Sequence, residues 1–214
     1  MAGKPRQLAL AFPRRGGGKQ PRAGRPRIHP HPGLIAPGVP HLERAKFASM
    51  RVVHVTHRVR PDAGYLRKDA PAAVLQQAFR DAAVRFGMRI AHYSIQGNHL
   101  HLVVEVDDSN ALTKGMQGLA IRIARRLNAR LGRRGPIFAD RYHANVLTSR
   151  RGVANAVRYV VGNYQRHTRE YLPAGFRDPL ATLLDRPLAP PLSWLLRVGW
   201  QLEPARVASP FEPP

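Results

Sequence analysis

The sequence predicts an α+β fold: a ferredoxin-like split β-α-β sheet in the order β-α-β-β-α-β, with an added C-terminal helix. Two observations predict it. Runs rich in β-branched residues alternate with runs that carry apolar residues at helical spacing, and a Gly-Asn turn joins two of the expected strands. Such a sheet is covered by helices on one face, so we expect the other face to be free to meet a ligand.

The expected elements follow in chain order. We expect strands at residues 50–59, 88–96, 99–106 and 142–148, and helices at residues 70–87, 110–131 and 151–172. The first helix is expected to stop at Gly87, and Gly97 with Asn98 forms a tight hairpin turn between the second and third strands. The sequence DDSN supplies residues that cap the N-terminus of the second helix.

Two tails are expected to flank this domain, which we place at residues 45–172. Residues 1–44 mix Pro, Gly, Lys and Arg without sustained periodicity and predict a disordered basic arm. One interpretation is that the arm only aids solubility or results from a wrongly chosen start codon. The other is that it contacts the phosphates of nucleic acid. Residues 173–214 form a proline-rich C-terminal tail, whose apolar piece PLSWLLRVGW is expected to pack on the domain.

The charge of the chain points to a polyanion as its partner. The 214 residues carry 35 Lys and Arg against 13 Asp and Glu, a net charge of +22, which attracts nucleic acid by counterion release. A membrane surface is the competing partner, but no apolar stretch is long enough to span a bilayer, and we expect a cytoplasmic protein. Because the sequence has no Cys, disulfides, thiolate metal sites and cysteine nucleophiles are excluded.

A pair of histidines stands in the expected strand HLHLVVEV. Side chains alternate along a strand, so His99 and His101 share one face of the sheet, where two imidazoles are able to hold one metal ion. A solvated or hydrogen-bonded pair has the same spacing, and a second such pair, His29 and His31, lies among prolines. The spacing alone therefore does not decide between these interpretations.

The last expected helix carries a second set of polar groups. Tyr159 and Asn163 are four residues apart, so a helix presents both on one face. With the histidine pair they complete a site in which two imidazoles and one amide oxygen hold a divalent cation, with positions left open for a phosphate. The Tyr159 phenol is the candidate covalent nucleophile of this set, and its attack on a phosphodiester would form a phosphotyrosine ester.

These residues resemble the HUH single-tyrosine transposases of insertion-sequence type, and especially the REP-associated tyrosine transposases of bacteria. The resemblance covers roughly residues 45–169 and rests on NHLHLVVE, GPIFADRYHANVL and RYVVGN. It implies that His99, His101 and Asn163 hold Mg²⁺ or Mn²⁺ and that Tyr159 is the nucleophile. The implied activity is that of a DNA transposase on single-stranded or hairpin DNA, which forms a 5′-phosphotyrosine link and releases a 3′-hydroxyl.

Two departures from the REP-associated branch stand in these motifs. The branch typically has Pro before the Asn-His pair, where this chain has Gly97, and Pro after the Asn of the last helix, where this chain has Tyr164. The second departure removes a helix terminator and makes Tyr164 a rival nucleophile. Because five residues turn a helix by about 140° beyond a full turn, the two tyrosines cannot face one metal equally. The spacing to Asn163 favours Tyr159.

A basic flank on the second expected helix and the loop after it predicts contact with the DNA backbone. This flank comprises Arg122, Arg125, Arg126, Arg130, Arg133 and Arg134. Arg141, which is close to the last helix in sequence, and Arg158, which adjoins Tyr159, are further candidates. The alternative for each is a solvated surface charge.

Two other functions are alternatives, of which the first stays open at this point. A domesticated DNA- or RNA-binding protein on the same scaffold, with its chemistry unused, would carry the same charge. A phosphoesterase that uses water would need a general base, and Glu105 shares the histidine face but lies about 13 Å from His101, which is too far. The sequence also leaves open which DNA sequence is recognised, whether the protein still transposes, and whether it acts as a monomer or as a homodimer with a shared site.

Overall fold

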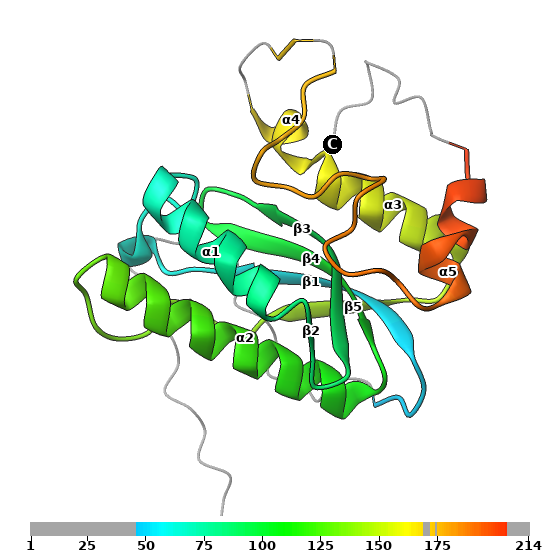
Figure 1. The fold of residues 1–214 in the computed structure, drawn as a ribbon, viewed down its shortest axis with the longest axis horizontal. Helices are drawn as coiled ribbons and strands as arrows, with labels where there is room; N and C mark the ends of the chain where they lie inside the picture. Colours follow the sequence, from blue (N-terminus) through cyan, green and yellow to red (C-terminus); the bar gives the residue numbers. More distant parts are fainter. Residues whose placement is uncertain (1–45, 169–171, 174, 205–214) are drawn as a thin grey trace, which may run out of the picture. The chain divides into compact units, whose positions relative to one another are not determined.

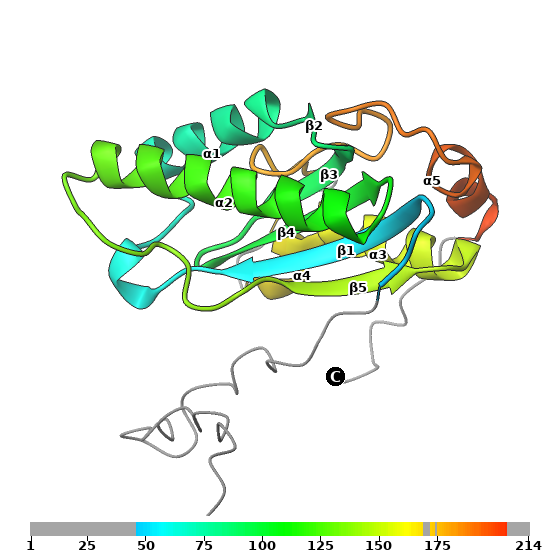
Figure 2. The same ribbon diagram turned by 90° about the horizontal axis from the view of Figure 1, so that it is seen from below.

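A computed structural model describes residues 46–168, 172–173 and 175–204. These residues form a five-stranded sheet that has helices on both faces (Figures 1 and 2). The basic arm expected at residues 1–44 lies outside the described residues, as does the end of the C-terminal tail from residue 205. No helix in the described part of the chain is long and apolar enough to cross a membrane.

The sheet has the split β-α-β connectivity that the sequence predicts. Its strands, in the order β2-β3-β4-β1-β5, are β2 (Val84–Arg85), β3 (Met88–Ile95), β4 (His99–Val106), β1 (Arg51–Arg58) and β5 (His143–Leu147). Strand β4 pairs antiparallel with both β1 and β3, so these two run parallel with β4 inserted between them. This arrangement confirms the ferredoxin-like plan, to which β2 adds a short edge strand.

Helices α1 (Asp69–Asp81) and α2 (Ser109–Arg130) cover one face of the sheet, above it in Figure 2. Their buried side chains meet the inward residues of β4 and form the larger core cluster, which includes Leu75, Phe79, Met116, Leu119, Ile123, Leu100, Leu102 and Val104. The Asp108 carboxylate accepts a hydrogen bond from the Ala111 backbone N–H, so the DDSN sequence caps α2 as expected.

The opposite face of the sheet carries α3 (Arg150–Val161), so the expectation of an uncovered face was wrong for part of it. The cause is the apolar stripe of this helix, which packs on the sheet. The second core cluster joins Val153, Val157 and Val160 to Val52 and Val103. The remainder of this face holds the histidine pair.

Two helices end earlier than the sequence predicts. Helix α1 stops at Asp81 because Val84–Arg85 pair with β3 through a turn whose residues Phe86 (φ 57°) and Gly87 (φ 73°) are both left-handed. The last helix is interrupted at Gly162 (φ −93°, ψ 10°), which separates α3 from a short α4 (Asn163–His167). Tyr159 and Asn163 therefore lie in two successive helices rather than in one.

The C-terminal segment packs on the domain. The backbone N–H groups of Thr182, Leu188 and Ala189 donate to carbonyls of β3 at 2.8–3.0 Å, so this segment follows the edge of β3 that β2 leaves uncovered. Two short helices follow, α5 (Trp194–Arg197) and η2 (Gly199–Leu202), and they place Leu196 and Trp200 in the cluster under α3. The apolar piece PLSWLLRVGW thus packs as expected.

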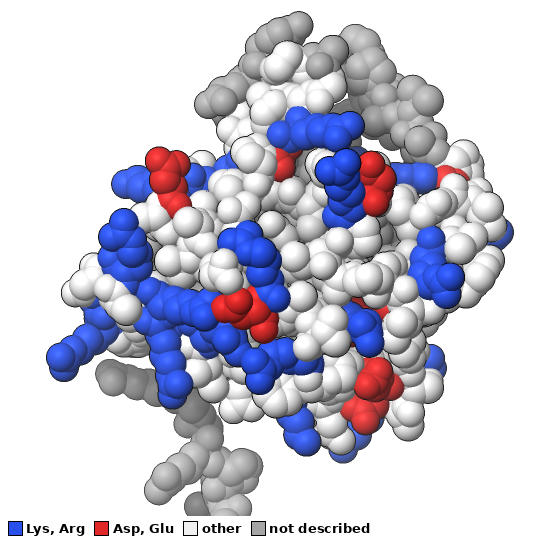
Figure 3. All heavy atoms as spheres, viewed as in Figure 1, with Lys and Arg blue, Asp and Glu red and all other residues white. Residues whose placement is uncertain are grey.

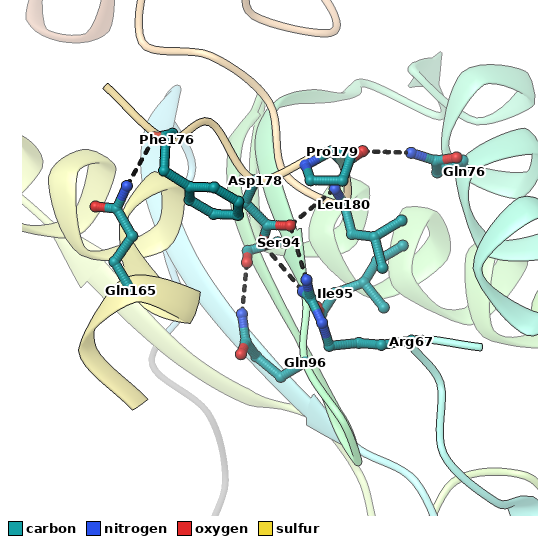
Figure 4. A network of polar contacts seen from close by, with 10 residues as sticks. All are labelled: Arg67, Gln76, Ser94, Ile95, Gln96, Gln165, Phe176, Asp178, Pro179 and Leu180. Atoms are coloured by element: carbon teal, nitrogen blue, oxygen red, sulfur yellow. Dashed lines mark hydrogen bonds and ion pairs between the residues drawn. The ribbon is translucent and has the colours of Figure 1, made fainter. Parts of the chain in front are cut away.

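A buried ion pair fastens the start of this segment, as Figure 4 shows. The Arg67 guanidinium donates to both carboxylate oxygens of Asp178, at 2.8 and 3.0 Å, and to the carbonyl of Ile95 at 2.7 Å. Gln76 of α1 donates to the Pro179 carbonyl, and Gln165 of α4 donates to the Phe176 carbonyl. The segment is therefore held by α1, β3 and α4 together.

Candidate active site

Strand pairing brings polar side chains from β1 and β4 onto one face of the sheet. Thr56 lies directly opposite His101 of β4 and directly opposite His143 of β5. His54, two residues earlier on β1, shares the face of Thr56. The histidine face therefore has contributions from three adjacent strands.

The rings on this face form a compact cluster with the tyrosine of α3. The ring centroids of His99 and His101 are 4.7 Å apart, and the Tyr159 ring stands edge-on to His101 with centroids 5.2 Å apart. The His54 ring stacks on His101 at 5.4 Å and lies 6.0 Å from the Tyr159 ring. The structure thus brings together His99, His101 and Tyr159, and it adds His54.

The ring nitrogens of both strand histidines have polar neighbours. His101 is 4% exposed, and its Nδ1 lies 3.2 Å from His54 Nε2 and 3.2 Å from Thr56 Oγ1. His99 is half-buried, and its Nδ1 lies 2.7 Å from Asn98 Oδ1. In each ring, therefore, Nδ1 is engaged by a nearby side chain.

His54 is neutral at physiological pH. Burial lowers the pKa of His54 to about 4, and the charge of nearby His143 acts in the same direction. A neutral imidazole has one nitrogen that donates and one that accepts a hydrogen bond. His54 therefore brings no positive charge into the cluster and retains an acceptor nitrogen.

The side chain of Asn163 is buried, and none of the described residues forms a hydrogen bond with it. The residue is 0% exposed, and neither Oδ1 nor Nδ2 has a partner within the described residues. An amide left unsatisfied in this way costs about 1–3 kcal/mol, unless a ligand meets it. No hydrogen bond joins this amide to the histidine pair.

The donor set fits a divalent cation. Among the described residues no group of three or more His, Asp or Glu side chains could hold a metal ion, so a site on this face needs a ligand of another type. A carboxamide oxygen is a ligand of that type, and that of Asn163 has no hydrogen-bond partner among the described residues. A site of two imidazoles and one amide oxygen binds Mg²⁺ or Mn²⁺ less tightly than a site of carboxylates does. It leaves coordination positions open for phosphate oxygens.

The rival tyrosine lies in a different environment. Tyr164 of α4 has the Arg67 guanidinium over its ring, 3.8 Å from the centroid, and its ring centroid is 6.1 Å from that of Phe176. It therefore belongs to the contacts that fasten the C-terminal segment. Tyr159, by contrast, faces the histidine rings.

The arginines expected to bind DNA lie in three places. Those of α2 are on the face of the sheet opposite to the histidines, and Figure 3 shows Lys and Arg side chains gathered there along α2. Arg126 pairs with Asp81 at 2.6 Å, and Arg133 pairs with Asp62 at 3.0 Å. The exposed residues Arg125, Arg130 and Arg134 belong to the same flank.

Two further arginines were candidates for DNA contact. Arg158 donates to the backbone carbonyls of Glu203 and Pro204, which ties the C-terminal segment to α3. Arg141 is half-buried in the loop before β5, where its backbone N–H donates to the Asp140 carboxylate. The Arg158 guanidinium is therefore engaged by the C-terminal segment.

Glu105 has a structural role. Its carboxylate is 1% exposed and accepts hydrogen bonds from the backbone N–H groups of Leu192 and Ser193, at 2.6 and 2.8 Å. These bonds anchor the chain just before α5. The Glu105 carboxylate thus fastens the C-terminal segment to β4.

Sequence reasoning missed His54 and Thr56. The signal was present in HVT, because residues 54 and 56 share a strand face by the same period of two that pairs His99 with His101. The sequence alone does not predict the register in which β1 pairs with β4, and this register brings His54 and Thr56 next to His101.

Comparisons with known proteins show the family and the fold of the chain. The family model described as "Transposase IS200 like" matches residues 49–163, which is more than half of the chain. The fold is similar to that of a REP-associated tyrosine transposase bound to a REP hairpin, with a TM-score of 0.54 and 13% identity over 69% of this chain and 84% of that one. A transposase-like protein from Deinococcus radiodurans R1 matches at a TM-score of 0.40 and 15% identity, over 50% of this chain and 87% of that one. No curated protein matches the chain.

Proposed function

The chain belongs to the family of IS200-like transposases, and from that premise we propose that it cleaves and joins single-stranded or hairpin DNA through a tyrosine nucleophile. The observation that carries the proposal is the contact of Tyr159 with His101, at a centroid distance of 5.2 Å. It places the sole phenol of the ring cluster beside two imidazoles that suit a metal ion. The hairpin-bound state of the similar transposase supports DNA of this kind as the substrate.

In this proposal Tyr159 is the nucleophile. Its phenol oxygen bonds to the phosphorus of a phosphodiester, the bond to the 3′ oxygen breaks, and the DNA keeps a free 3′-hydroxyl. The phenol proton leaves to solvent, and the departing 3′ oxygen takes one up. The 5′-phosphotyrosine ester keeps the energy of the broken bond, so the reverse attack by another 3′-hydroxyl joins strands without a further energy source.

His99, His101 and Asn163 are the proposed ligands for Mg²⁺ or Mn²⁺. A cation held there would supply positive charge against the negative charge that develops on the phosphate. The packing of α3 on Val52 and Val103 fixes the height of Tyr159 above the sheet. The protein's own contribution is thus to orient the phenol and to hold the imidazoles in reach of it.

Contacts with the DNA backbone are proposed for arginines whose side chains are not already committed. We keep this proposal for Arg122, Arg125 and Arg134. Arg141 is proposed as a further contact only because of its place in the chain, in the loop before β5. Arg126, Arg133 and Arg158 already bond to Asp81, Asp62 and backbone carbonyls, so their main contribution is to the fold. Residues 1–44, outside the described residues, are proposed to add phosphate contacts through their charge.

The proposal is tested by cleavage of a labelled single strand from the flanks of the protein's own gene, in the presence of Mn²⁺. His101→Ala should abolish cleavage, and Asn163→Ala should reduce it less, because two imidazoles would remain. His57→Gln is the matched control, since His57 lies next to Thr56 on β1 but faces the α1 and α2 side. Full cleavage by His101→Ala would contradict the proposed metal site. Retained DNA binding without any cleavage by the unmodified protein would favour a binding module.

A further inference from the structure

The two strand histidines share one feature of their surroundings. In both rings Nδ1 lies within hydrogen-bond distance of a side-chain atom: Asn98 Oδ1 at 2.7 Å for His99, and Thr56 Oγ1 and His54 Nε2, each at 3.2 Å, for His101. The neighbours come from the hairpin turn and from the adjacent strand β1. Neither ring therefore has Nδ1 available for a cation.

These neighbours are themselves fixed by the sheet. Thr56 is the direct cross-strand partner of His101, so the register of β1 against β4 sets the distance between them. The carbonyl of Asn98 accepts a hydrogen bond from the Val59 backbone N–H at 2.9 Å, which pins the turn beside the end of β1. The three neighbours are thus positioned by backbone pairing and do not depend on a ligand.

We propose that Asn98, Thr56 and His54 are positioning residues that hold His99 and His101 with the proton on Nδ1, so that each ring presents Nε2 to the cation. The proposal rests on the function proposed above and assigns these three residues a part in it. In it, each Nδ1–H donates to an acceptor: the Asn98 amide oxygen for His99, and the Thr56 hydroxyl and His54 Nε2 for His101.

The physical reason is that a metal binds only an unprotonated ring nitrogen. A free imidazole divides its proton between two nitrogens and rotates about its χ2 torsion, so part of its population presents the wrong atom. A hydrogen bond from Nδ1–H to a fixed acceptor removes both freedoms and raises the basicity of Nε2. Loss of such a partner typically weakens metal binding on the order of 10- to 100-fold.

The test uses pairs of variants at the two β1 positions. Thr56→Val and His54→Leu remove the acceptors at similar volume, whereas Thr56→Ser and His54→Gln each keep an acceptor near the original atom. Mn²⁺ affinity is measured by calorimetry on the full chain without DNA. Nitrogen-15 spectra of the imidazole rings report which nitrogen carries the proton in the metal-free protein.

We expect the Thr56→Val and His54→Leu double variant to bind Mn²⁺ on the order of 10- to 100-fold more weakly, with both conservative variants close to the unmodified protein. We also expect His101 to carry its proton on Nδ1 in the unmodified protein and to lose that preference in the double variant. His57→Gln, on the other face of β1, should change neither readout.

Two results would overturn the inference. Unchanged Mn²⁺ affinity in the double variant would show that the acceptors do not position His101, while the proposed function would stand. A proton on Nε2 of His101 in the unmodified protein would contradict the assigned tautomer. Absence of any Mn²⁺ binding by the unmodified protein would instead remove the proposed metal site, and the inference with it.

Discussion

The guanidinium of Arg67 lies over the ring of Tyr164, 3.8 Å from its centroid, while it also forms a bidentate ion pair with Asp178. This relationship separates the two tyrosines that the sequence placed in competition. Tyr164 packs in the contacts that fasten the C-terminal segment, and Tyr159 stands against the imidazole of His101. We accordingly expect Tyr164 to contribute to stability and Tyr159 to take part in the chemistry.

Substitution of Tyr164 tests the structural half of this division. Tyr164→Phe keeps the ring under Arg67, so we expect strand cleavage to persist with a small change in stability. Tyr164→Leu removes the cation–π contact and should lower the free energy of unfolding by about 1 kcal/mol. Urea unfolding followed by circular dichroism gives the stability, and a cleavage gel gives the activity. Loss of cleavage in Tyr164→Phe, with the fold retained, would contradict the division.

The buried Arg67–Asp178 pair should be far more sensitive to substitution than an exposed pair. Their side chains are 9% and 2% exposed, so Asp178→Ala leaves a guanidinium in the interior without its counterion. We expect a loss of about 3–5 kcal/mol in the free energy of unfolding. Asp62→Ala is the control, because the Asp62 carboxylate, which pairs with Arg60 and Arg133, is 54% exposed to solvent. Equal losses for the two variants would contradict the role given to the buried pair.

Local patterns in the sequence predicted the elements that carry strong periodicity. The alternation in HLHLVVEV placed His99 and His101 on one face, and helical spacing gave α1, α2 and α3. The ends of helices were less predictable. Phe86, in the turn after α1, adopts a left-handed backbone conformation that residues other than glycine rarely adopt. A single glycine, Gly162, also interrupts a run that reads as continuous helix.

Long-range contacts were beyond the reach of local patterns. The segment that follows the edge of β3 binds through backbone groups of Thr182, Leu188 and Ala189, which leave no side-chain pattern in a proline-rich sequence. The part played by His54 depends on the register between β1 and β4, two strands that are separated by most of the first half of the domain. Such pairings are fixed by the whole sheet and not by the residues on either side of them.

Stability should fall as the pH drops below neutrality, in part because of His92. Burial lowers the pKa of His92 to about 4 from its usual 6.5, while its Nδ1 lies 3.2 Å from Thr182 Oγ1. Above pH 6.5 the ring is neutral in both the folded and the unfolded chain, so it has no effect there. Between pH 6.5 and 4 only the unfolded chain takes up the proton, so the free energy of unfolding declines by up to about 3 kcal/mol.

The variant His92→Asn isolates this contribution, because the Asn amide can keep a hydrogen bond to Thr182 without titrating. Urea unfolding at several pH values between 7 and 4 measures the effect. We expect a flatter decline for the variant than for the unmodified protein. A decline of the same steepness in both proteins would show that His92 does not take part.

The basic flank of α2 should contribute affinity for DNA without taking part in cleavage. Arg122 and Arg125 lie on the face of the sheet opposite to Tyr159. The double variant Arg122→Gln and Arg125→Gln should bind DNA more weakly. The slope of log affinity against log salt concentration should fall in magnitude by about 1.4–1.8, the loss expected from two phosphate contacts. Arg126→Gln is the control, since Arg126 is already paired with Asp81. An unchanged slope would show that this flank is only a solvated surface.

The central claim is that Tyr159 forms the covalent bond to DNA. Its most direct measurement is to incubate the full chain with a 3′-labelled single strand from the flanks of its own gene and Mn²⁺, separate the products on a denaturing gel, and map the peptide that carries the label. We predict an adduct whose labelled peptide contains Tyr159, its loss in Tyr159→Phe with DNA affinity and fold retained, and its persistence in Tyr164→Phe. An adduct that survives in Tyr159→Phe and disappears in Tyr164→Phe would contradict the claim.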